Sequence, residues 1–222
     1  MTVPDRDASR RRRSVAMAGH AGGAERPAGD RAAAEGTARD GLGDAEPAVR
    51  ATALGALSRL EVLRLADVKA ATGDPHPTVR ARAAELAPRV GPAAGRFLID
   101  LLSDPRLEVV EATCFGLGEL GATPHAVEAL AEVAAGHSDP LCRETAVAAL
   151  GSIGPVGDGV GAGRAAILAA MQDKPAVRRR AVLALAPFDG PEVDQALETA
   201  LEDRDWQVRQ AAEDLTGHRR AR

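Results

Sequence analysis

The sequence predicts an all-α solenoid built from about seven helical hairpins, and three observations support this fold class. A short motif recurs every 30 to 35 residues, a period typical of stacked helix pairs. The apolar residues, which make up 45% of the chain, are mostly Ala, Leu and Val, whereas aromatic residues make up only 2%. Ala, Leu, Arg and Glu favour helix, and strand-forming residues are scarce. Thin layers of closely packed helices suit such a composition.

The motif consists of an acidic residue, a short loop that often contains Pro, a Val-Arg pair, and then Ala and Leu at helical spacing. The copy that starts at Asp173 shows it clearly, because Val177-Arg178 leads into Ala181 and Leu185. We expect the small Ala to let neighbouring helices approach and the Leu to fill the layer between them. The six copies place the arginine position at Arg50, Arg80, Val110, Arg143, Arg178 and Arg209.

A degenerate seventh copy precedes these six, because Asp7 lies the usual distance before Arg12-Arg13. We therefore interpret the run from Arg10 to Arg13 as the start of a repeat helix, rather than as a targeting segment or a nucleic-acid-binding arm. Residues 5–40 then form a capping repeat, and residues from about 41 to 218 form the regular repeats. The whole chain, 1–222, is predicted to be one repeat array.

Each repeat also needs a first helix before its acidic residue. In residues 191–202 the apolar side chains recur at i, i+3, i+4, i+7 and i+8 from Val193, which indicates one buried helix face. Pro191 lies in the first turn, where a missing N–H is tolerated. The predicted first helices span residues 28–40, 63–72, 92–103, 125–136, 164–172 and 191–202.

The recurring Asp and Arg side chains are predicted to form a ladder. Each Asp would cap its own helix, and each Arg would reach a neighbouring Asp or a turn carbonyl. The alternative is a catalytic carboxylate cluster, but structural ion-pair networks are common. We expect Cys114 and Cys142 to be small buried apolar residues, and we expect the ring of Trp206 to pack between repeats.

Composition limits the classes of function. The net charge of −4 lacks the basic excess of a general nucleic-acid-binding protein. No stretch approaches the roughly 20 apolar residues that cross a bilayer, and two cysteines are too few for a disulfide framework. We therefore expect a cytoplasmic monomer that binds neither a membrane nor, as its main partner, a nucleic acid.

The pattern Asp…Val-Arg…Ala…Ala-Leu-Gly resembles HEAT repeats, and in particular the short HEAT-like units first associated with phycobilisome lyases. The resemblance covers roughly residues 5 to 218. It implies a right-handed α-solenoid whose second helices line the concave face. It does not specify an activity, because proteins with similar repeats include lyases, deoxyhypusine hydroxylases, DNA glycosylases and binding proteins.

The residues that these enzymes need are missing from the pattern. Deoxyhypusine hydroxylases, which resemble this array, hold two irons with recurrent His-Glu dipeptides, and no histidine here is followed by Glu. The histidines are His20, His76, His125, His137 and His218. Rings that would flank a tetrapyrrole or stack on a base are few. We therefore assign no catalytic residue, no metal ligand and no cofactor.

The leading hypothesis is a non-catalytic scaffold or adaptor that binds another protein through its concave face. Two alternatives stay open: an enzyme or enzyme subunit of the HEAT-like lyase or hydroxylase (oxidoreductase) type, and nucleic-acid binding through the Arg clusters. Positions one, two and five after the arginine position avoid the Ala/Leu stripe, so they would face a partner. In the central repeats these are Arg82, Glu85, Glu111, Phe115, Glu144, Arg179 and Arg180. Such a mixed surface with one aromatic anchor suits a charged protein or peptide.

Overall fold

The computed structural model describes residues 6–20, 28–156 and 160–220, and in these ranges it contains helices and turns but no strand. The predicted all-α solenoid class is confirmed. The chain divides into two compact units, one up to Leu101 and one from Leu102 onward. The prediction that residues 1–222 form a single array stays a prediction.

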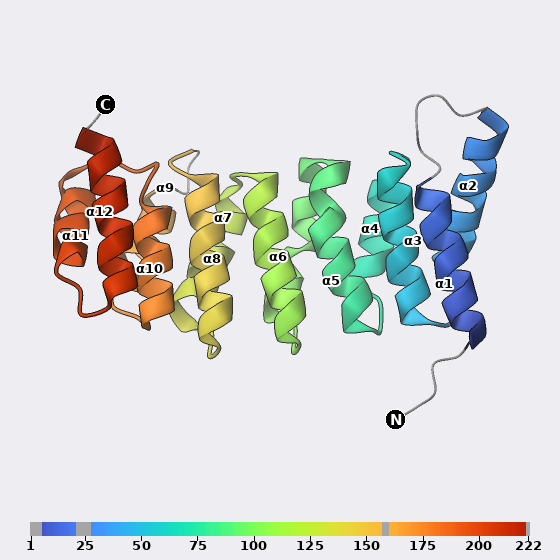
Figure 1. The fold of residues 1–222 in the computed structure, drawn as a ribbon, viewed down its shortest axis with the longest axis horizontal. Coiled ribbons are helices and arrows are strands. Elements are labelled where there is room, and N and C mark those ends of the chain that lie inside the picture. The colour runs from blue at the N-terminus through green and yellow to red at the C-terminus, as the bar shows by residue number, and fades with distance from the viewer. Residues whose placement is uncertain (1–5, 21–27, 157–159, 221–222) are drawn as a thin grey trace. The chain divides into compact units, whose positions relative to one another are not determined.

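The first unit consists of alternating helices in two layers. Its α-helices are α1 (Arg6–Gly19), α2 (Ala28–Gly41), α3 (Pro47–Arg59), α4 (Leu65–Thr72) and α5 (Pro77–Leu86). Helices α1, α3 and α5 lie side by side, with α2 and α4 behind them (Figure 1). The core between the layers contains the fully buried side chains of Val49, Leu57 and Val68.

Helix α1 contains the whole run from Arg10 to Arg13 and packs against α2 and α3. The run therefore lies within a packed helix, and its interpretation as the start of a degenerate repeat stays a prediction. Residue 5 and residues 21–27 of the predicted capping repeat lie outside the described residues.

The predicted first helix at 92–103 is wrong in type. The structure has three short 3-10 helices in this region, η1 (Ala87–Val90), η2 (Pro92–Phe97) and η3 (Ile99–Ser103). Gly91 has a φ of +93°, which interrupts the helix that precedes it. Gly95 further weakens helix formation, because glycine costs about 1 kcal/mol relative to alanine in a helix. Despite this change, η2 still packs against α4 as a first helix would.

The second unit repeats the two-layer arrangement over more hairpins. Its helices are α6 (Leu107–Leu120), α7 (Pro124–Gly136), α8 (Pro140–Ile153), α9 (Val160–Ala170), α10 (Pro175–Ala184), α11 (Pro191–Leu201) and α12 (Trp206–Arg220). Helices α6, α8, α10 and α12 each contact the next and form one layer, while α7, α9 and α11 form the other (Figure 1). Leu117, Leu150 and Leu185 occupy the predicted leucine position and are buried.

Candidate functional site

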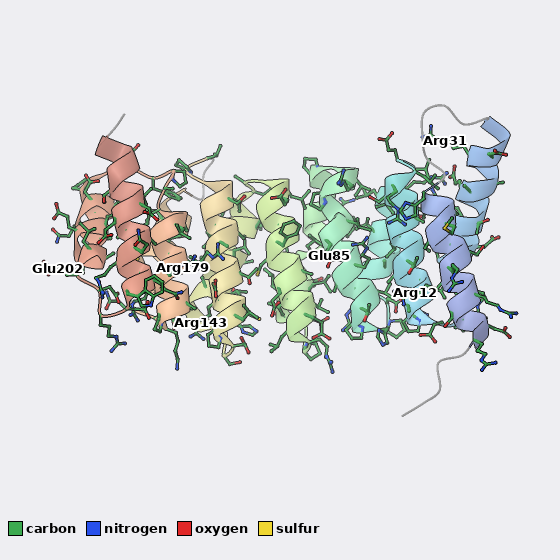
Figure 2. The ribbon with its side chains drawn as sticks, in the orientation of Figure 1. Arg12, Arg31, Glu85, Arg143, Arg179 and Glu202 are labelled. Atoms are coloured by element: carbon green, nitrogen blue, oxygen red, sulfur yellow. The ribbon has the colours of Figure 1, made fainter. Side chains whose placement is uncertain are left out.

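The predicted surface residues lie on the second helices of both units. Arg82 and Glu85 belong to α5 of the first unit, and Figure 2 shows Glu85 on that helix. The others belong to α6, α8 and α10 of the second unit, where Figure 2 shows Arg179 on α10. The predicted residues therefore fall into two sets, one in each unit.

In the first unit, Arg82 is held in place by its surroundings. Its Nη1 donates a hydrogen bond of 2.7 Å to Glu85 one turn later. A Cβ atom built on Gly55 of α3 would lie 2.7 Å from Nη2 of Arg82, so the guanidinium group fills the space beside this glycine. Arg82 and Glu85 thus neutralise each other on the α5 surface.

In the second unit, one of the two predicted basic residues is also paired. Arg180 on α10 contacts Glu144 on α8 at 3.3 Å, whereas Arg179 is exposed. The ring of Phe115 on α6 is 52% exposed, which is unusual for a large apolar side chain. The surface therefore keeps its aromatic residue, but carries less free positive charge than the sequence suggests.

Glu111 lies one helical turn before Phe115 and is half-buried. Its pKa is raised, first by burial and then by the negative charges of Asp139 and Glu108. Because neither Glu111 nor Asp139 makes an ion pair with a described residue, this part of the surface is acidic.

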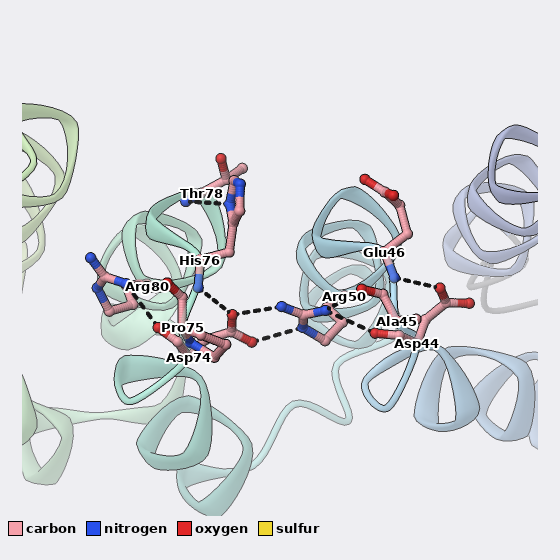
Figure 3. A network of polar contacts seen from close by, with 9 residues as sticks. All are labelled: Asp44, Ala45, Glu46, Arg50, Asp74, Pro75, His76, Thr78 and Arg80. Atoms are coloured by element: carbon pink, nitrogen blue, oxygen red, sulfur yellow. Dashed lines mark hydrogen bonds and ion pairs between the residues drawn. The ribbon is translucent and has the colours of Figure 1, made fainter. Parts of the chain in front are cut away.

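The Asp/Arg ladder is present in both units, as predicted. In the first unit Arg50 donates from Nε and Nη2 to the two carboxylate oxygens of Asp74, at 2.8 and 2.7 Å. Its Nη1 donates to the carbonyl oxygens of Asp44 and Ala45 in the preceding turn (Figure 3). In the second unit the same two-oxygen contact joins Arg143 to Asp173 and Arg178 to Asp203.

The aspartates cap the turns in a way that differs in detail from the prediction. Asp74 accepts a hydrogen bond of 2.8 Å from the N–H of His76, which is itself the N-cap residue of α5. Asp139, in contrast, is the N-cap residue of α8 and accepts from Leu141 at 2.8 Å. In either arrangement the carboxylate fixes the backbone just before the second helix.

The electrostatics of the ladder agree with these contacts. The hydrogen bonds from Arg143 and Arg178 lower the pKa of Asp173 and Asp203, respectively, against the opposing effect of burial. For Asp74, burial would raise the pKa, but the bonds from Arg50 and the His76 N–H together lower it. These carboxylates stay ionised and occupied, so they serve structure rather than acid–base chemistry.

The histidines and cysteines of the described chain do not form a reactive centre. The Nδ1 atoms of His76 and His137 accept backbone N–H bonds from Thr78 and Asp139, which gives both rings capping roles. Within the described residues no three His, Cys, Asp or Glu side chains gather as metal ligands. The side chain of His218 lies outside the described residues.

The two thiols are buried, as predicted. Burial raises the pKa of Cys114 to about 12 and that of Cys142 to about 11. A reactive thiol needs the opposite shift, because the thiolate is the nucleophile. These residues therefore fill the core and do not form a site.

The expectation for Trp206 is wrong, because its side chain is 63% exposed. Trp206 is the first residue of α12, and the inter-repeat core there is filled by Val208 and Ala212, both fully buried. The ring is therefore a second exposed aromatic group in the second unit, one that sequence reasoning missed as a surface feature.

Two crevices lie between hairpins of the first unit, next to ladder pairs. One has a volume of about 180 Å³ and is lined in part by Arg50, Leu54 and Asp74. The other, about 220 Å³, is lined in part by Arg11 and Asp44. Sites for drug-sized ligands usually measure about 300–1,000 Å³, so these crevices are small for such ligands.

No helix in the described part of the chain is long and apolar enough to span a bilayer.

Comparisons with known proteins identify the repeats. The family model for HEAT repeats matches residues 65–151 and 137–215, which together are more than half of the chain. No curated protein sequence matches the chain.

Solved structures share the fold at low sequence identity. A chain of the CpcE–CpcF complex of phycocyanin lyase from Nostoc sp. PCC7120 is similar with a TM-score of 0.58 and 20% identity, over 68% of this chain and 97% of that one. An engineered protein has a TM-score of 0.56 and 18% identity, over 96% and 65% of the two chains. A chain in the structure of Kap95p with RanGDP has a TM-score of 0.57 and 16% identity, over 90% and 34%. At these identities the likeness concerns the fold alone.

Proposed function

Because the chain belongs to the HEAT-repeat family, we propose that it is a non-catalytic scaffold that binds another protein through the exposed face of its second helices. That face would be the concave one in the predicted array. We further propose that it acts in the cytoplasm as a monomer.

The observation that carries this proposal is the half-exposed ring of Phe115 among charged side chains on α6, α8 and α10. Protein interfaces concentrate binding energy in aromatic residues and Arg, surrounded by polar groups that exclude water. Arg179 supplies an exposed cation on the same layer of helices. In the first unit, the second helix α5 carries its own exposed charged pair, Arg82 and Glu85.

Two further observations support binding over catalysis. The carboxylates most suggestive of an active site, those of Asp74, Asp173 and Asp203, are bonded to ladder arginines. Two of the similar solved structures are complexes between proteins, CpcE with CpcF and Kap95p with RanGDP.

The proposal is tested by affinity purification of partners with paired surface variants. Phe115→Ala combined with Arg179→Glu should abolish recovery of a partner that the wild-type chain captures, because it removes the aromatic anchor and reverses the exposed cation. Arg180 is left unchanged because it is bonded to Glu144. Circular dichroism of the double variant confirms that the helices remain.

The matched control reverses charge on the other layer of the same unit. Glu132→Arg on α7 and Glu198→Arg on α11 change exposed residues of first helices and should leave partner recovery intact. Recovery that survives the second-helix variant, or is lost only with the first-helix variant, would overturn the proposal. Stoichiometric iron or a bound chromophore in the purified protein would favour an enzyme instead.

A further inference from the structure

Two ion pairs join adjacent second helices at the α8–α10 junction of the second unit. Arg143 on α8 reaches Asp173, in the turn before α10, at 2.6 Å. Arg180 on α10 reaches back to Glu144 on α8 at 3.3 Å. Each carboxylate at this junction therefore has an arginine from the neighbouring repeat.

The preceding junction, between α6 and α8, lacks both arginines. Val110 occupies the position that corresponds to Arg143, and its side chain is fully buried. Thr145 occupies the position that corresponds to Arg180, and its hydroxyl donates to the carbonyl oxygen of Leu141. Glu111 is the counterpart of Glu144 and remains. The ladder position of Asp173 is held here by His137, whose carbonyl oxygen accepts from Arg143 as that of Asp173 accepts from Arg178. Asp139 lies two residues further on, as the N-cap residue of α8.

These two carboxylates are close enough to affect each other. Asp139 is among the charges that raise the pKa of Glu111. Helix α6 contains three glutamates and no lysine or arginine. The nearby guanidinium of Arg143 is already bonded to Asp173 and to the carbonyl oxygens of the turn before α8. Among the described residues neither carboxylate is in an ion pair, although the charge of Asp139 contributes to the raised pKa of Arg143. The junction therefore remains acidic.

Exposed apolar side chains lie beside this charge. Phe115 follows Glu111 by four residues, so both lie on one face of α6. Leu141, two residues after Asp139 at the start of α8, is 51% exposed. An exposed ring on the same helix face as Glu111 favours a partner that brings a cation and an apolar group together, because Arg both pairs with carboxylates and stacks on rings.

We propose that the α6–α8 junction binds a basic segment of a protein partner, in which an arginine or lysine pairs with Glu111 and Asp139 and an adjacent apolar side chain packs on Phe115. Toward Glu111 the partner's cation takes the role that Arg180 has toward Glu144 at the next junction. This inference rests on the proposed function and specifies the chemistry of the partner.

A synthetic peptide tests the inference without knowledge of the natural partner. A fluorescein-labelled peptide of the repeating sequence Leu-Arg-Gly is titrated with the full chain and followed by fluorescence anisotropy. A Leu-Glu-Gly peptide and a Gly-Arg-Gly peptide serve as comparisons. The Leu-Arg-Gly peptide should bind most tightly and lose affinity as salt increases. In NMR spectra of the ¹⁵N-labelled chain it should shift backbone amides of α6 and α8.

Two sets of variants locate the site. Glu111→Gln with Asp139→Asn should weaken binding about tenfold or more, because it removes both carboxylates, while Asn keeps a good N-cap for α8. Thr145→Arg should pair with Glu111 in the manner of Arg180 and Glu144 and should also weaken binding, whereas Thr145→Gln should not. Glu144→Gln changes a carboxylate that is already paired and should alter affinity less than about twofold.

Different results would contradict the α6–α8 site and the proposed function. Equal binding of the Leu-Glu-Gly peptide, no binding of the Leu-Arg-Gly peptide, amide shifts outside α6 and α8, or unchanged affinity in the Glu111/Asp139 variant would overturn the α6–α8 site. The proposed function would still stand if the cellular partner is lost with Phe115→Ala and Arg179→Glu. If that partner is retained by those variants, the proposed function fails whatever the peptide does.

Discussion

Arg178 donates hydrogen bonds of 2.8 Å from Nε and Nη2 to the two carboxylate oxygens of Asp203, which lies in the turn before the next second helix. The two side chains are only 7% and 14% exposed. The Nη1 atom also donates to the carbonyl oxygen of Asp173, in the turn before its own helix. One guanidinium therefore joins two successive turns, and this contact holds the α10 and α12 hairpins at a defined spacing.

Replacement of Arg178 should destabilise the second unit. Arg178→Ala leaves Asp203 without its charged donor in a largely buried position, and we expect the free energy of unfolding to fall by about 1.5–3 kcal/mol. Arg178→Lys should cost less but should not restore wild-type stability, because an ammonium group cannot donate to both oxygens in the same fork. The midpoint of urea unfolding, followed by circular dichroism, measures both effects.

The control for this prediction is an exposed arginine pair in the same unit. Arg106 contacts Glu108 at 3.2 Å, but both side chains are at least half exposed, and such pairs contribute little. Arg106→Ala should leave the urea midpoint unchanged. Equal shifts for Arg106→Ala and Arg178→Ala would show that the ladder contact has no special role.

Acid should weaken the fold through the ladder aspartates. The pKa values of Asp74, Asp173 and Asp203 are lowered in the folded chain, so folding favours their ionised forms. Their stabilising contribution is fully present above the ordinary aspartate pKa of about 3.9. It is lost as the pH falls through the lower folded-state values. We expect the urea midpoint to fall steeply below about pH 4.

A variant that already lacks one pair tests the origin of this pH dependence. Asp203→Asn should be less stable than the wild-type chain at pH 7 and should lose less stability on acidification. If the wild-type midpoint stays constant or rises below about pH 4, the ladder does not stabilise the chain through ionised aspartates.

The repeat motif predicts most helices because its Ala and Leu positions are the ones that are buried between helices. Ala181 and Leu185 recur at equivalent positions in other repeats and are fully buried, so their spacing reveals the buried helix face. The same reasoning fails at 92–103, where the positive φ of Gly91 and the weak propensity of Gly95 produce 3-10 helices. A local backbone preference there outweighs the apolar pattern.

The surface is harder to predict because it depends on contacts between repeats. The pairing of Arg180 with Glu144 requires knowing which positions of adjacent helices face each other. The same knowledge is needed to see that Glu111 has no such partner in the described part of the chain. One signal was available in the sequence, namely Val110 at the arginine position. For Trp206, its place at the start of a helix was a better guide to exposure than its size.

Truncation of a buried leucine should destabilise the chain much more than truncation of an exposed leucine on the same helix. Leu150 on α8 is 1% exposed, and Leu150→Ala should cost about 2–5 kcal/mol, from lost burial and the cavity that remains. Leu141, on the same helix, is half exposed and makes a suitable control. Thermal unfolding should separate the two variants clearly, and similar midpoints would contradict the assigned core.

The buried thiols should be protected from alkylation in the folded chain. Burial raises the pKa values of Cys114 and Cys142 to about 12 and about 11, so almost no thiolate forms at pH 8 and the reagent has little access. Iodoacetamide followed by mass spectrometry should label neither residue in buffer and both in concentrated guanidinium chloride. Rapid labelling of native Cys142 would show that the start of α8 opens readily.

Close approach of second helices requires glycine at one position of α8. A Cβ built on Gly151 would lie 2.7 Å from both the Cα and the Cβ of Ala184 on α10. Because backbone atoms cannot move away as a flexible side chain can, Gly151→Ala must separate the two helices. We expect a loss of about 1–3 kcal/mol in the free energy of unfolding, despite the higher helix propensity of alanine.

Gly36 in α2 provides the opposite case, because a Cβ there would meet nothing within 4 Å. Gly36→Ala should stabilise its helix by about 0.5–1 kcal/mol, since alanine loses less backbone entropy on folding. The two substitutions add the same methyl group to a helix, so their opposite signs in urea unfolding would isolate the contact with Ala184. If Gly151→Ala also stabilises the chain, α8 and α10 do not pack as closely as the structure describes.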